Sequence, residues 1–62
     1  MQPNELEKGY LEKTMANGEV MTLANGPNNG FDVDQWDSNG ANRWHRWYAT
    51  YPEALKEYER WN

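Results

Sequence analysis

The pattern of hydrophobic and polar positions divides much of this chain into segments of strand length. The dipeptide Asn-Gly occurs four times, at 17–18, 25–26, 29–30 and 39–40. Both residues accept the positive φ angles that the two central positions of a type I′ hairpin turn require. Residues 19–24, 31–37 and 43–50, which these turns bound, carry β-branched or aromatic side chains. Their spacing predicts an antiparallel meander, and Pro27 excludes a strand from the second connection.

The end of the chain changes to a helical period. Apolar side chains recur there at spacings of three and four, at Tyr51, Ala54, Leu55, Tyr58 and Trp61. Thr50 and Glu53 match a capping box, which makes Thr50 the N-cap. Pro52 disfavours helical angles at Tyr51, so Tyr51 is the alternative N-cap. In both cases we expect the helix to start within one residue of Pro52.

The N-terminal part leaves a helix, a strand or neither open for residues 3–16. Leu6, Tyr10, Leu11 and Met15 approximate helical spacing. Alternatively, Asn17-Gly18 closes a two-residue hairpin that pairs Leu11 with Ala24, Lys13 with Thr22 and Met15 with Val20. We favour the hairpin because Gly9 weakens a helix.

Together these elements predict an α+β fold. It is a small antiparallel β-meander of three or four strands, with one C-terminal α-helix packed on one face. We expect residues 1–9 to be a flexible segment, because they carry almost nothing to bury, and residues 10–62 to be a single domain.

A five-residue loop at 38–42 would set the register of the last hairpin. Val33 would then face Trp47, and Gln35 would face His45, under the helix. Trp36 would face Trp44 on the opposite face. That outer face would hold Trp36, Trp44, Tyr48, Arg43 and Arg46, beside Asp32 and Asp34. Exposed aromatic and arginine side chains are typical of binding surfaces, so these first five are the candidate binding residues. Alternatively, the N-terminal segment covers them.

Composition makes the aromatic residues decisive for the core. The 62 residues include only seven that are Leu, Val or Phe, and none that is Ile. Trp, Tyr and Phe together number nine. A chain of this size is too small for a multi-domain enzyme. It has no Cys for a disulfide scaffold and no apolar run long enough to cross a membrane. Since no N-terminal run resembles a secretory signal, we expect a cytoplasmic location.

Catalytic and metal-binding patterns are weak. His45 is the only histidine and Ser38 the only serine, and the predicted partner of His45, Gln35, does not orient a base. Asp32, Asp34 and Asp37 do not match a calcium loop, because position 12 counted from Asp32 is Arg43. We therefore expect no enzyme activity, no cofactor and no metal.

Charge is uneven along the chain, whose net value is −4. Residues 1–37 carry −5 and residues 38–62 carry +1. A negative net charge weighs against a general binder of polyanions. However, residues 43–48 interleave basic and aromatic side chains, which suits phosphate contact with base stacking.

The last strand and the helix resemble the ethylene-response-factor type of domain and the arm-binding domain of tyrosine recombinases. The residues that carry this resemblance are Trp47, Thr50-Tyr51, Glu53-Ala54 and Tyr58. In those domains the outer face of a three-stranded sheet enters the major groove of DNA. The resemblance implies that Trp36, Arg43, Trp44 and Arg46 contact DNA. The chain departs from them in its shorter strand-to-helix connection, its few basic residues and the acidic Asp32 and Asp34.

The sequence thus favours a small non-enzymatic binding module that contacts a protein partner through the outer face of its sheet. The alternative is a DNA- or RNA-binding accessory protein of a phage or mobile element that uses the same face. A third hypothesis is that the acidic N-terminal half binds a basic protein. We expect no membrane partner, and the oligomeric state stays open.

Overall fold

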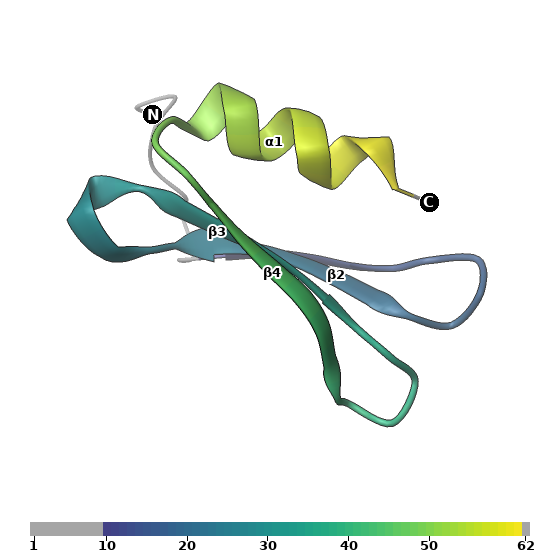
Figure 1. The fold of residues 1–62 in the computed structure, drawn as a ribbon. Helices are drawn as coiled ribbons and strands as arrows, with labels where there is room; N and C mark the ends of the chain where they lie inside the picture. Colours follow the sequence, from purple (N-terminus) through teal and green to yellow (C-terminus); the bar gives the residue numbers. More distant parts are fainter. Residues whose placement is uncertain (1–9, 62) are drawn as a thin grey trace.

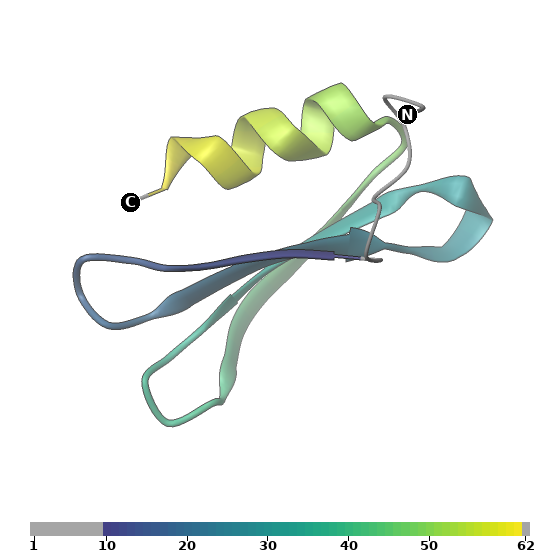
Figure 2. The ribbon, with the colours of Figure 1, turned by 180° about the vertical axis from the view of Figure 1, so that it is seen from behind.

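The computed structural model describes residues 10–61, which form a four-stranded antiparallel sheet and one helix. The elements are β1 (Tyr10–Thr14), β2 (Val20–Asn25), the short 3-10 turn η1 (Pro27–Asn29), β3 (Phe31–Trp36), β4 (Asn42–Tyr48) and α1 (Tyr51–Arg60). The strand order is β1-β2-β3-β4, and α1 lies on one face of the sheet (Figures 1 and 2). The predicted α+β fold class is confirmed. The flexible segment predicted for residues 1–9 lies outside the described residues.

The first hairpin confirms strands, not a helix, for residues 10–14 and 20–25. Its turn differs from the predicted type I′ turn, because only Gly18 has a positive φ (87°), and its N–H donates to the Met15 carbonyl at 3.0 Å. This geometry makes a three-residue loop in which the last residue is left-handed. The register is therefore shifted by one residue, and Leu11 pairs with Leu23 rather than with Ala24.

The β3–β4 turn has the same form, and the predicted five-residue loop is wrong. The Asp37 N–H donates to the Ala41 carbonyl at 2.8 Å, and Gly40 has a φ of 86°. Asp37 Oδ1 also accepts from the N–H groups of Asn39 and Ala41, both at 2.9 Å. These hydrogen bonds shorten the loop to three residues, 38–40, because they draw Asp37 into the turn.

A β-bulge lies at the start of β4. Trp36 pairs with Asn42, whereas Gln35 pairs with Trp44, so that Arg43 is the extra residue. From this point the register differs by one residue from the predicted one. Since side chains alternate along a strand, this single step moves every later side chain of β4 to the opposite face.

The helix covers the face that holds the core. Its buried side chains are Ala54 and Tyr58, and Tyr51, Leu55 and Trp61 are partly buried, which confirms the predicted apolar face. Below it lie the buried side chains of the sheet, Met21, Leu23, Phe31 and Val33, and the buried Met15, which directly follows β1. The Phe31 and Tyr51 rings meet edge to face at 5.5 Å. No helix in residues 10–61 is long and apolar enough to span a membrane.

The helix begins at the predicted place. Thr50 is extended (φ −128°, ψ 153°) and is the N-cap, and Pro52 lies in the first turn. The predicted capping box is not formed, since the Thr50 hydroxyl donates to the Glu53 carboxylate at 2.8 Å instead of accepting from the backbone. The pair therefore links two side chains across the first turn.

Candidate functional site

The sheet face opposite α1 is uncovered by any described element (Figures 1 and 2), and we call it the open face. The strand registers arrange its side chains in three rows across the sheet. These rows are Tyr10, Ala24, Asp32 and Trp47; Glu12, Thr22, Asp34 and His45; and Thr14, Val20, Trp36 and Asn42. The open face therefore combines three aromatic rings with three carboxylates.

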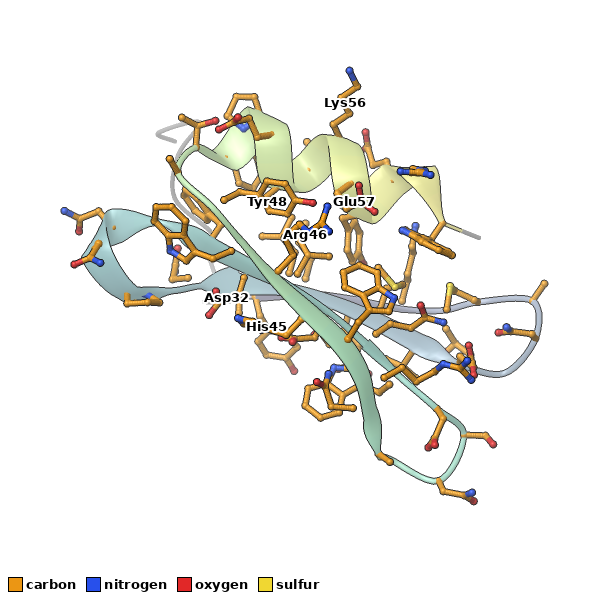
Figure 3. The ribbon with its side chains drawn as sticks, viewed as in Figure 1. Asp32, His45, Arg46, Tyr48, Lys56 and Glu57 are labelled. Atoms are coloured by element: carbon orange, nitrogen blue, oxygen red, sulfur yellow. The ribbon has the colours of Figure 1, made fainter. Side chains whose placement is uncertain are left out.

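Only Trp36 of the five predicted binding residues lies on the open face, with Asp32 and Asp34 as predicted. The shifted register places Trp44, Arg46 and Tyr48 on the face below α1, so the predicted grouping is wrong. Figure 3 shows Arg46 and Tyr48 on the helix side of β4 and Asp32 and His45 on the other side. The bulge explains this separation, because its extra residue, Arg43, moves every later side chain of β4 to the opposite face.

Trp44 and Arg43 belong to a polar network at the edge of the core. The Trp44 indole N–H donates to the Oε1 atom of the buried Gln35, whose amide donates to Glu19. Arg43 forms an ion pair with the same Glu19 at 2.8 Å. The Trp44 ring also packs against Trp61 at 5.8 Å. These two predicted binding residues are therefore engaged by the sheet and the helix.

Trp47 is the open-face ring that the sequence interpretation placed under the helix. This residue is 42% exposed, and its indole N–H donates to the Pro27 carbonyl at 3.0 Å. The ring lies directly over Gly30, where a Cβ atom would stand 2.2 Å from the indole nitrogen. Trp47 is therefore held across the β2–β3 connection at one end of the open face.

His45 lies between two carboxylates in the middle of the open face. Its Nδ1 atom is 2.6 Å from Asp34 Oδ1, and its Nε2 atom is 3.4 Å from Asp32 Oδ1. The predicted partner, Gln35, is instead buried on the other face. Within residues 10–61, no three His, Cys, Asp or Glu side chains are placed to hold a metal ion. The imidazole thus forms a hydrogen bond with Asp34 and lies close to Asp32.

Trp36 stands at the end of the open face opposite Trp47. Its indole N–H donates to the Thr22 hydroxyl at 3.0 Å, which fixes the ring across β2. The two tryptophans thus flank the acidic middle of the face. The alternation of the sequence was enough to predict that Trp36 lies on this face. The position of Trp47 depends on the register of β4, which the sequence pattern did not predict correctly.

Charge separates the two faces of the sheet. The open face holds Glu12, Asp32 and Asp34, and none of the Lys and Arg residues within 10–61 lies in its three rows. Lys13 and Arg46 lie on the helix side, Arg43 is paired with Glu19, and Lys56 and Arg60 belong to α1. The open face is therefore an aromatic surface of negative charge.

Comparisons with known proteins add no relationship to this geometry. The resemblance to ethylene-response-factor and recombinase arm-binding domains stays a prediction, and function must be argued from the open face. The chain matches no protein-family model, no curated protein and no solved structure.

Proposed function

We propose that this protein is a small non-enzymatic binding module that binds a basic segment of a partner protein on the open face. The observation that carries this proposal is the composition of that face: Tyr10, Trp36 and Trp47 surround carboxylates without a Lys or Arg among them. A few side chains supply most of the binding energy at protein interfaces, and Trp and Tyr are enriched among them. Complementary charge selects the partner and raises the association rate.

The charge of the open face also weighs against nucleic acid as the partner. Nucleic-acid surfaces use Lys and Arg to neutralise phosphates, and each such contact contributes to affinity. Arg43 and Arg46, which the sequence suggested for that role, are placed off the open face. Asp32 and Asp34 would repel a phosphate backbone. The acidic surface instead suits Arg and Lys side chains.

The surroundings of His45 support a binding role better than a catalytic one. Its imidazole contacts two carboxylates. The one hydroxyl in its row, that of Thr22, accepts a hydrogen bond from Trp36 and belongs to a different strand. Catalysis by a histidine base requires a nucleophile within its reach and a site that encloses substrate. The open face supports recognition better than chemistry.

The proposal can be tested with peptides selected on the immobilised protein from a random display library. We expect enrichment of peptides rich in Arg and Lys. In calorimetric titrations, Tyr10→Ala and Trp36→Ala should each weaken a selected peptide by about tenfold, which corresponds to a loss of ~1.4 kcal/mol. Lys56→Ala on the outer side of α1 is the control and should bind as the unaltered protein does.

The nucleic-acid alternative is tested in parallel with duplex and single-stranded oligonucleotides at two salt concentrations. Binding to DNA or RNA should weaken with salt at a slope of ~0.9 per phosphate contact. Oligonucleotide binding with such a slope, together with no enrichment of basic peptides, would contradict our proposal and support the alternative.

A further inference from the structure

The tips of the two hairpins border a shallow, open pocket of about 370 Å³ at the Trp36 end of the open face. Gly18 and Gly40 belong to its two borders, and its lining side chains are Glu12, Val20, Thr22, Trp36, Asp37 and Ser38. We propose that this pocket binds the side chain of an arginine in the partner. This inference rests on the proposed function, since it names the side chain that the acidic surface recognises.

The size of the pocket suits one long side chain. Sites for small molecules usually have volumes of ~300–1,000 Å³, so this pocket lies at the lower end. A peptide that lies across the open face could place one side chain between the hairpin tips while its backbone continues over the sheet. The pocket is thus a specificity site within a larger surface.

The charge of the lining selects a cation. Glu12 and Asp37 are both in the lining, and no Lys or Arg is. Both turn hydrogen bonds of Asp37 end on its Oδ1 atom, so a ligand can engage Oδ2 without opening the turn. A neutral group would gain no charge attraction from these carboxylates, and an anion would be repelled.

The Trp36 ring supplies the second requirement of an arginine site. Its N–H is used by Thr22, which holds the indole in one orientation before a ligand arrives. A planar guanidinium can stack on an indole and still donate hydrogen bonds to carboxylates at its edge. The ammonium group of lysine is not planar, so it cannot stack on the indole while it donates to the carboxylates. Arginine is therefore preferred over lysine.

The experiment follows the Trp36 indole N–H in proton–nitrogen correlation spectra. The probe is Nα-acetyl-arginine amide, and the isosteric but uncharged Nα-acetyl-citrulline amide is its control. We expect saturable shifts with the arginine probe, at a dissociation constant on the order of millimolar, and none with citrulline. The variant Glu12→Gln should weaken binding at least about threefold. Glu59→Gln, the same change of charge on an exposed helix position, should leave it unaltered.

Equal shifts with citrulline, or unaltered binding by Glu12→Gln, would overturn the arginine site. Since Glu12 is an exposed residue of the edge strand β1, this variant does not remove a core contact. If the arginine probe fails while selected basic peptides still bind the open face, the pocket assignment is wrong and the proposed function stands. If neither the arginine probe nor a basic peptide binds, the pocket assignment and the proposed function are both wrong.

Discussion

At position 30 any side chain larger than that of glycine would clash with the Trp47 ring. The φ of Gly30, −95°, is open to any amino acid, so only the Trp47 ring above it demands glycine. Gly30→Ala should therefore displace the indole and break its hydrogen bond to the Pro27 carbonyl. We expect the free energy of unfolding to fall by about 1–3 kcal/mol, measured by chemical denaturation.

A double-mutant cycle supplies the control for Gly30. In a Trp47→Ala background the methyl group has no ring to meet, so Gly30→Ala should cost much less there. Equal costs in the two backgrounds would show that the contact with Trp47 does not explain the glycine.

Tyr58 makes the stability of the fold depend on pH in the alkaline range. Burial raises the pKa of its hydroxyl above the ordinary value of 10.0, and the negative charge of Glu12 adds to the effect. Because the folded state holds this proton more tightly than the unfolded state, its stability is complete below pH 10.0 and declines as pH rises through the folded-state pKa. Denaturation at several alkaline pH values should show this decline, and Tyr58→Phe should reduce it. An identical decline in Tyr58→Phe would contradict this assignment.

Trp44 connects the edge strand β4 to the end of the helix. Its ring packs on Trp61, and its N–H satisfies the buried Gln35. Trp44→Ala should therefore lower the free energy of unfolding by about 2 kcal/mol, since it removes a half-buried ring and leaves a buried amide oxygen without its donor.

Tyr10→Ala is the matched comparison for Trp44→Ala, because Tyr10 is 52% exposed on the edge strand β1. It should change stability by less than about 0.5 kcal/mol. If Trp44→Ala left stability unaltered but abolished binding of a basic peptide, Trp44 would belong to the open face, and the register described above would be wrong.

The elements themselves could be predicted from the sequence. The Asn-Gly dipeptides located the turns, and the change from alternation to a period of three and four located α1. The first hairpin could be predicted because one of these dipeptides, Asn17-Gly18, lies between its strands. These features are local, since they depend on a few neighbouring residues and their allowed backbone angles.

The register of β4 could not be predicted from its side-chain pattern. Aromatic residues occupy both parities of this strand, at Trp44 and Tyr48 on one face and Trp47 on the other. Alternation therefore does not say which face is buried. The decision comes from the Asp37 hydrogen bonds and the bulge at Arg43, which depend on backbone geometry. This is why only Trp36 of the five candidate binding residues was predicted on the correct face.

At the scale of the whole molecule, the negative charge of the open face should affect the rate at which a basic peptide associates. A basic peptide is attracted to the acidic open face, so its association rate should fall as salt rises, with little change in the dissociation rate. Stopped-flow measurements should show a shallower dependence on salt for Glu12→Gln than for Glu59→Gln. The two variants have the same net charge, and equal slopes would mean that charge on the open face does not guide association.

The open face illustrates how a small chain poor in aliphatic residues divides its aromatic rings. Phe31, Tyr51 and Tyr58 serve the core, and Trp44 and Trp61 attach the helix. Trp36, Trp47 and Tyr10 are left on the surface opposite. Because a single helix covers only one face of a sheet, the second face remains for the proposed contact with a partner.

The four tryptophans provide the most direct test of the central claim, which is that the open face binds a basic partner. Trp36 and Trp47 lie on the open face, and Trp44 and Trp61 lie on the helix side. The measurement is the titration of the four indole N–H resonances with a selected basic peptide. We predict that the resonances of Trp36 and Trp47 shift and saturate while those of Trp44 and Trp61 stay in place. Shifts confined to Trp44 and Trp61 would contradict the account.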